Sequence, residues 1–197
     1  APPARGTTVL VRGPLADPYG QLELRPATAG LVVLGVASLP TPLAVDSASL
    51  GKAQQRKDMT AIAVAHHVPY VAQAIAVHWH DLSEKVERAA AADGPAFLNV
   101  LTNCPVGWGH EPRASLEILN AAVDTCFWPL YEVTDGRYRL TYVPERLRPI
   151  EDWLRPQARF AHLLRPEARG VVAKIQLQID QEWAALRLRC EQDAAAA

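Results

Sequence analysis

Short apolar runs interrupt this chain at intervals and predict its strands. Four of them lie at residues 8–11, 31–36, 69–75 and 97–101, and each has the length of a buried strand. A stretch of helical spacing separates the last two runs, and the order strand, helix, strand predicts a right-handed crossover between two parallel strands. The pattern therefore indicates an α/β fold, in which residues 37–51 form a loop.

Apolar positions three or four residues apart predict three helices in the middle of the chain. The first begins at Asp58, a residue that can cap it, and ends near His66. The second has capping-box spacing at Asp81 and Glu84 and stops at Asp93-Gly94. The apolar residues of the three inner faces are Met59, Ile62 and Ala63; Leu82, Val86, Ala89 and Ala90; and Leu116, Leu119 and Val123.

The last third of the chain predicts a β-hairpin and a long helix. Residues 128–133 and 138–142 flank Asp135-Gly136, and an Asp-Gly pair between two strands is typical of a tight hairpin turn. Prolines interrupt residues 144–166, which we expect to cross a surface as loop and short helix. In the final helix, one apolar stripe runs along Val172, Ile175, Ile179, Trp183, Leu186 and Cys190.

Composition narrows the class of protein. A chain of 197 residues with 49% hydrophobic and 21% charged residues is typical of one globular domain. The formal net charge of -1 gives no reason to expect a nucleic acid or an anionic membrane as partner, and no apolar run has membrane-spanning length. Three scattered cysteines do not make a disulfide framework and fit a reducing compartment, so we expect a cytoplasmic location.

Cys104 is the residue with the clearest capacity for chemistry. It follows the apolar run at 97–101 and begins the segment Cys-Pro-Val-Gly-Trp, so a strand delivers it into a Pro/Gly turn. In open α/β sheets, ligands gather at the carboxyl ends of the strands, which makes a thiol there a candidate for cofactor chemistry. The alternative is a small apolar residue of the turn. Cys126 and Cys190 fall on apolar helical stripes, and we expect them in the core.

Two other polar groups are open to two interpretations. Four histidines, at 66, 67, 78 and 80, could ligate zinc, although helix-end positions for the first pair and a connecting loop for the second account for them without a metal. The arginine pairs at 146/148 and 187/189 could contact phosphate groups or a partner subunit, or they could lie on solvated faces. No phosphate loop, dinucleotide fingerprint or hydrolase motif accompanies them.

Six segments of the chain stand in a distinctive order and at consistent spacing. They are 56–63 (RKDMTAIA), 67–72 (HVPYVA), 93–96 (DGPA), 104–108 (CPVGW), 128–133 (WPLYEV) and 159–163 (RFAHL). Together they resemble the beta subunit of pyruvate:ferredoxin oxidoreductase, or pyruvate synthase; the match runs from about Thr41 to the end of the chain, and no segment is decisive alone. The fourth and fifth look more like the pyruvate type than the 2-oxoglutarate type.

The resemblance implies both a fold and an activity. The fold is a thiamine diphosphate-binding α/β domain with a mostly parallel sheet and flanking helices, to which the hairpin and the long terminal helix are added. The activity is oxidative decarboxylation of a 2-oxoacid, pyruvate, to acetyl-CoA, with two electrons passed through [4Fe-4S] clusters to ferredoxin. The implied cofactors are thiamine diphosphate, Mg²⁺ and a [4Fe-4S] cluster. The implied partners are the alpha, gamma and delta subunits and ferredoxin, with pyruvate and CoA as substrates.

The same resemblance assigns three site residues. Cys104 corresponds to the fourth thiolate of the proximal cluster, and Thr41 and Pro42 correspond to a Thr-Pro pair near the thiamine diphosphate. No catalytic residue is assigned. The family's Cys-x-x-Cys pair, its third cysteine and its Gly-Asp-Gly magnesium loop have no counterpart in this sequence. One thiolate cannot hold a cubane cluster, and a diphosphate without its metal would bind weakly.

The point where the resemblance begins divides the chain into two parts. Residues 1–40 match no part of the family, and we expect a scrambled or truncated amino-terminal segment there. Residues 41–197 correspond to the carboxyl-terminal part of the beta subunit, so we expect the chain alone to be an incomplete enzyme. The alternative is a catalytically inactive fragment that acts only as a subunit-interaction module, through the hairpin at 128–142, the Pro-rich segment and the terminal helix.

Overall fold

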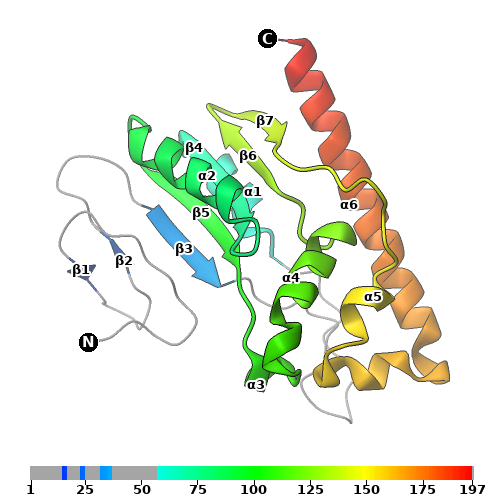
Figure 1. The fold of residues 1–197 in the computed structure, drawn as a ribbon. Coiled ribbons are helices and arrows are strands. Elements are labelled where there is room, and N and C mark those ends of the chain that lie inside the picture. Colours follow the sequence, from blue (N-terminus) through cyan, green and yellow to red (C-terminus); the bar gives the residue numbers. More distant parts are fainter. Residues whose placement is uncertain (1–14, 17–22, 25–31, 37–56, 197) are drawn as a thin grey trace.

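A computed structural model of the protein describes residues 57–196 together with the strands at 15–16, 23–24 and 32–36 (Figure 1). The strands are β1 (Leu15–Ala16), β2 (Glu23–Leu24), β3 (Val32–Val36), β4 (Tyr70–Ile75), β5 (Ala96–Leu101), β6 (Tyr131–Thr134) and β7 (Arg137–Leu140). The α-helices are α1 (Met59–Ala65), α2 (Trp79–Ala91), α3 (Pro105–Trp108), α4 (Ser115–Asp124), α5 (Glu151–Leu154) and α6 (Arg169–Ala195). Short 3₁₀ turns are η1 (Pro112–Ala114), η2 (Ala158–Leu164) and η3 (Pro166–Ala168).

The main sheet has five strands in the order β3-β5-β4-β6-β7. The strands β3, β5 and β4 are parallel, with Ala96 of β5 opposite both Val32 and Tyr70. The hairpin β6-β7 extends the sheet by antiparallel pairing of β6 with β4. The predicted fold class and the parallel pair around α2 are confirmed. The strand β3 lies within the segment 1–40, so residues on both sides of the predicted division share one sheet.

The two faces of the sheet are covered by different helices (Figure 1). Alternate residues of β4 and β5, among them Ala72 and Leu98, pack with Ala89 of α2. Residues of opposite parity, Val71 of β4 and Val133 of β6, pack with α1, and Leu186 of α6 reaches the same cluster. This alternation is the one expected for a sheet buried on both faces.

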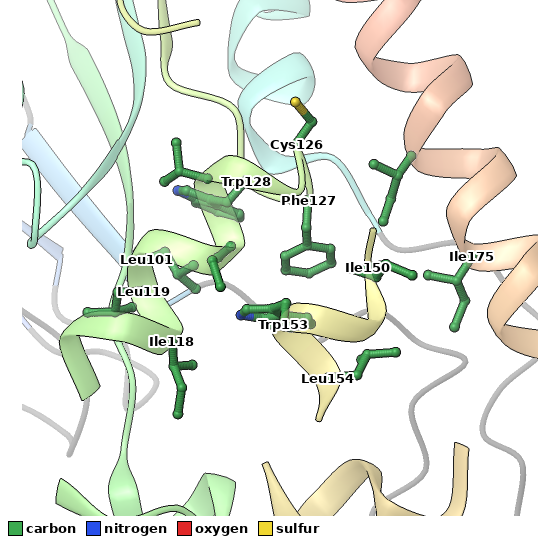
Figure 2. Packing of buried hydrophobic residues seen from close by; sticks show 14 of the residues in the cluster. Leu101, Ile118, Leu119, Cys126, Phe127, Trp128, Ile150, Trp153, Leu154 and Ile175 are labelled. Atoms are coloured by element: carbon green, nitrogen blue, oxygen red, sulfur yellow. The ribbon is translucent and has the colours of Figure 1, made fainter. Parts of the chain in front are cut away.

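A third and larger cluster lies beyond the carboxyl ends of β4 and β5 (Figure 2). Ile75 and Leu101 end these strands and join residues of α4, α5 and α6. At its centre the rings of Phe127 and Trp153 stack with centroids 4.1 Å apart and an interplanar angle of 22°. The segment after β5 therefore lies against this cluster, which its residue Trp108 contacts.

The local signals at turns and caps are confirmed where the backbone geometry allows a test. The side chain of Asp58 accepts a hydrogen bond from the backbone N–H of Ala61 at 2.9 Å and caps α1. Asp135 and Gly136 have φ values of 49° and 80°, the left-handed geometry of a two-residue hairpin turn. The predicted stripe of α6 is buried at every position except Leu186, which is partly buried.

The predicted helix faces were wrong in part, because Ala63, Leu119 and Val123 are buried as expected but other predicted positions are exposed. Met59 and Ile62 are 45% and 42% exposed and Leu116 is 64% exposed, while Thr60 is fully buried. Thr60 faces the sheet because its hydroxyl donates to Gln73 and accepts from Asn99, two polar side chains that the strands bury. Apolar spacing could not reveal that requirement.

The predicted capping box of α2 was also wrong. The helix begins after His78, and Asp81 lies inside its first turn, where it pairs with Lys85 at 2.6 Å. Lys85 is fully buried and also donates to the carbonyl of Gln73 and the hydroxyl of Thr141, each at 2.8 Å. Ala90, predicted on the inner face, is exposed. A charged residue therefore lies on the inner face of α2, beside the positions Leu82 and Val86 that apolar spacing assigned to that face.

Cys126 and Cys190 are 7% and 8% exposed, so their prediction as core residues is confirmed. Cys126 lies just after α4 at φ 53°, in a turn and not on a helical stripe as expected. The predicted strand at 8–11 and loop at 37–51 lie outside the described residues. In the parts of the chain described above, no helix combines the length and the hydropathy required to cross a bilayer.

Candidate functional site

Cys104 lies three residues beyond the end of β5 and is the N-cap residue of α3. Its sulfur accepts a hydrogen bond from the backbone N–H of Gly107 at 3.4 Å, and Pro105 at the first helical position needs no hydrogen bond of its own. A Cβ on Gly107 would lie 3.5 Å from the same sulfur. The residue is exposed, so the turn presents its thiol to the outside of the fold.

The turn that follows Cys104 is fixed on the segment η2. Gly109 ends α3 at φ 66°, and its carbonyl accepts from the backbone N–H of Ala158 at 2.9 Å. A Cβ at Gly109 would lie 2.9 Å from the Cβ of Ala158, so glycine is required by both conformation and space. A contact between residues far apart in the sequence therefore sets the position of the turn.

Asn103 attaches the same turn to α4. Its side-chain amide donates to the carbonyl of Ser115 at 3.0 Å, and it lies 3.4 Å from Nε2 of His110. Trp108, the last residue of α3, packs edge-on to Trp153 with centroids 6.0 Å apart. The residues around Cys104 are thus held by contacts with η2, α4 and the large apolar cluster.

The donor set fits one ligand of an iron–sulfur cluster and no more. A cubane cluster needs four thiolates. Burial raises the pKa of the Cys126 thiol to about 12 and that of Cys190 above its ordinary value, so neither offers a thiolate. Within residues 57–196, no group of three or more histidine, cysteine or acidic side chains could hold a metal ion. Any further cluster ligands must come from outside these residues.

Thr41 and Pro42 lie outside the described residues, so their predicted place beside thiamine diphosphate stays a prediction. The four histidines are divided between two helix ends. His66 and His67 end α1 as expected, whereas His78 caps α2 and His80 lies within it, not in the connecting loop that we predicted.

Three of the four arginines in the two pairs have acidic partners among the described residues. Arg148 pairs with Asp152 at 2.9 Å and approaches Asp124 at 3.9 Å. Arg187 and Arg189 pair with the acidic residues one helical turn later in α6, at 3.4 and 3.3 Å. These contacts favour the interpretation of solvated helix and loop faces, since most of the charge is balanced locally.

Arg159 is a candidate that the spacing of residues did not single out. It lies on η2, and its guanidinium carbon is 3.7 Å from the ring centroid of Trp108. The only signal in the sequence was its place in the segment 159–163, which belongs to the resemblance. Its stacking partner is 51 positions earlier in the chain (159 minus 108), so only the folded structure brings the two together.

Comparison with curated proteins finds relatives among PorB and VorB subunits. No protein-family model matches the chain. The chain is 38% identical over 138 residues to the pyruvate synthase subunit PorB of Methanocaldococcus jannaschii, which covers 70% of this chain and 45% of that protein. PorB of Thermotoga maritima is 40% identical over 134 residues, 68% of this chain and 41% of the relative. The ketoisovalerate oxidoreductase subunit VorB of Pyrococcus horikoshii is 30% identical over 140 residues, 70% of this chain and 44% of VorB.

The chain spans slightly less than half the length of the curated relatives that it matches, and this partial coverage fits a carboxyl-terminal portion. The resemblance drawn from six sequence segments is confirmed. Over about 70% of its length, and at 38–40% identity, the chain is homologous to the pyruvate synthase subunit PorB.

Proposed function

We propose that this chain is a component of a 2-oxoacid:ferredoxin oxidoreductase that oxidises pyruvate to acetyl-CoA. The observation that carries the proposal is the identity of 34–40% to PorB subunits over about 70% of the chain, against 30% to a ketoisovalerate oxidoreductase subunit. In this function the chain works within a complex of alpha, gamma and delta subunits, and passes electrons toward ferredoxin. The cytoplasm is the compartment where such an assembly with free thiols would operate.

Within that complex, Cys104 supplies one thiolate to a [4Fe-4S] cluster. Its exposure and its position after β5 support this role, since a ligand can approach a thiol at a strand's carboxyl end. The hydrogen bond from Gly107 suits an anionic sulfur, and the fixed turn holds the sulfur in one place. The other three thiolates are supplied from outside the described residues.

Thiamine diphosphate, when bound with Mg²⁺, supplies the electron sink for decarboxylation. Thr41 and Pro42 are the residues of this chain that we place beside the cofactor, from the resemblance alone. The two-part organisation belongs to the same proposal: residues 41–197 act as the carboxyl-terminal part of the subunit, and residues 1–40 are a scrambled or truncated amino-terminal segment whose strand β3 joins the sheet. We assign no residue of this chain to proton transfer or bond cleavage.

A second candidate function is that of a catalytically inactive module that only binds partner subunits. One observation favours it: Cys104 is the one exposed cysteine among the described residues, so a single accessible cluster ligand is present there. The surface for such binding includes exposed apolar side chains such as Val106 and Leu116, which are 94% and 64% exposed.

Reconstitution with the proposed partners separates the two functions. The chain is co-expressed with alpha, gamma and delta subunits, and the reduction of ferredoxin is measured with pyruvate and CoA, then with 3-methyl-2-oxobutanoate. Pyruvate-dependent turnover that disappears when this chain is omitted is the expected result. Assembly without turnover, corrected by a full-length beta subunit, would establish the inactive module. Failure to assemble at all would contradict both functions.

A further inference from the structure

The side chain of Arg159 carries a positive charge that no described residue neutralises. Its Nε and Nη2 both donate to Oε1 of Gln157, a neutral and fully buried acceptor. Nη1 is buried and has no hydrogen-bond partner in the described part of the chain. Burial lowers the pKa of Arg159 to about 9, so the guanidinium stays charged near neutral pH. A cation held this way costs stability unless something compensates for its lost hydration.

Aromatic rings provide part of that compensation. The guanidinium carbon lies 3.7 Å from the centroid of Trp108 and 4.4 Å from that of Phe160, with Trp153 at 5.7 Å. Such contacts fix the plane of the guanidinium and leave its charge in place. Arg159 is therefore rigid, charged and without a carboxylate partner among these residues.

The position of this charge is tied to Cys104. Trp108 donates its backbone N–H to the carbonyl of Cys104 at 2.8 Å, and its ring is the surface on which Arg159 rests. The carbonyl of the next residue, Gly109, accepts a hydrogen bond from the backbone N–H of Ala158, the neighbour of Arg159 in η2. One helical turn and one stacked ring thus separate the cation from the cysteine, a distance on the order of 10 Å.

We propose that Arg159 is a positioning residue of the Cys104 turn, which it holds through Trp108, and that it supplies positive potential to an anionic group bound there. The anionic group is the iron–sulfur cluster with its thiolates, so the inference rests on the proposed function for its ligand. The positive electrostatic potential of Arg159 is a property of this chain and is present without the cluster. It gives a role to an arginine that has no carboxylate partner among the described residues and lies near the exposed thiol.

The potential can be measured on the full chain without any cofactor. Iodoacetate and iodoacetamide alkylate the same thiol, but only the first is negatively charged, and the ratio of their rates is independent of the thiol's ionisation. Cys104 is the reporter because the other two cysteines are buried, and a Cys104→Ser variant gives the background. We compare wild type, Arg159→Met, Arg159→Lys and the matched control Arg155→Met, an exposed arginine on the end of α5.

Arg159→Met should lower the iodoacetate-to-iodoacetamide ratio by about two- to fivefold, from one charge at this distance in a medium between protein surface and water. Arg159→Lys should keep most of the ratio, and Arg155→Met should leave it unchanged. In wild type, about 1 M salt should reduce the ratio toward that of Arg159→Met, which tests the charge without any variant. The inference would be overturned if Arg159→Met left the iodoacetate-to-iodoacetamide ratio unchanged, whether neither alkylation rate changed or both changed by the same factor.

A second measurement separates this inference from the proposed function. In the assembled complex, Arg159→Met should make the cluster held by Cys104 harder to reduce, because a positive charge near an anion favours its reduced state. A shift in the alkylation ratio with no shift in reduction potential would mean that Arg159 acts on the turn but Cys104 holds no cluster. Shifts in neither quantity would remove the role of Arg159.

Discussion

Replacement of Glu132 by glutamine tests the charged network that joins the hairpin to the parallel strands. Glu132 lies on β6 and is 4% exposed. It accepts hydrogen bonds from the Tyr70 hydroxyl at 2.8 Å, from Arg88 at 3.0 Å and from Nε of Arg139 at 3.0 Å. These donors come from β4, α2 and β7, so one carboxylate connects three elements. Glutamine keeps the shape of the side chain and removes its charge.

The expected cost comes mainly from the buried contact. Tyr70 is 2% exposed, and a hydrogen bond to a charged group contributes about 1.5–3 kcal/mol. The side chains of Arg88 and Arg139 are 38% and 59% exposed, so each pair adds only about 0.2–1 kcal/mol after solvent screening. Glutamine still accepts one bond from Tyr70, so we expect Glu132→Gln to lower the free energy of unfolding at pH 7 by about 2 kcal/mol.

The same contact predicts a pH dependence. Burial alone would raise the pKa of Glu132, but hydrogen bonds from Arg139 and Tyr70 outweigh it and hold the pKa below its ordinary value. A carboxylate with a lowered pKa in the folded state stabilises the fold above its unfolded pKa, and the contribution disappears as the pH falls through the folded pKa. Wild type should therefore lose this contribution in acid, and Glu132→Gln should lack it at every pH.

Urea unfolding followed by circular dichroism, at steps from pH 7 to about pH 3, measures both effects. The matched control is Glu84→Gln, whose side chain is 63% exposed in its pair with Arg88 and whose loss should cost less than about 0.5 kcal/mol. The difference between wild type and Glu132→Gln should shrink toward zero in acid. A variant as stable as wild type at pH 7, or a difference that stays constant with pH, would refute this account of the network.

Three further substitutions test how the fold holds the Cys104 turn and its sheet. Lys85→Met removes the fully buried ammonium from its pair with Asp81 and should lower the free energy of unfolding in urea by about 3 kcal/mol, whereas exposed Lys174→Met should have almost no effect. Gly109→Ala forces a left-handed alanine against Ala158 and should cost about 2 kcal/mol in the same assay; a stability equal to wild type would mean that the turn adapts. Asp58→Ala removes the cap of α1 and should cost about 1 kcal/mol, whereas Asp58→Asn should keep most of the wild-type stability because its amide oxygen can still accept from Ala61; no loss in Asp58→Ala would mean that water replaces the cap.

Sequence patterns were most successful where one local signal decides the structure. Asp135-Gly136 specifies a hairpin because both residues accept positive φ, and the observed turn has that geometry. The stripe from Val172 to Cys190 predicted α6 because a long helix repeats its apolar positions many times. Cys104 was expected after a strand because an apolar run ends at Leu101, and the structure has it there.

Sequence patterns were least successful where one buried polar side chain supplies the hydrogen-bond partner of another. Thr60 replaces its apolar neighbours on the inner face of α1 because Gln73 and Asn99 need a hydroxyl, and no local spacing records that need. Lys85 is buried for a similar reason, since its three acceptors come from α2, β4 and the segment after β7. The contact that singles out Arg159, its guanidinium on the ring of Trp108, forms only when η2 packs on α3. Long-range partners, and not propensity, decided each of these positions.

The role of Cys104 as a cluster ligand is tested most directly by iron and acid-labile sulfide per complex, measured for wild type and Cys104→Ala after assembly with the partner subunits. Cys104→Ala should lose one cluster, about four iron and four sulfide per chain, while Cys190→Ala, a change at a buried position of α6, should keep full content. Equal iron and sulfide in wild type and Cys104→Ala would contradict that role.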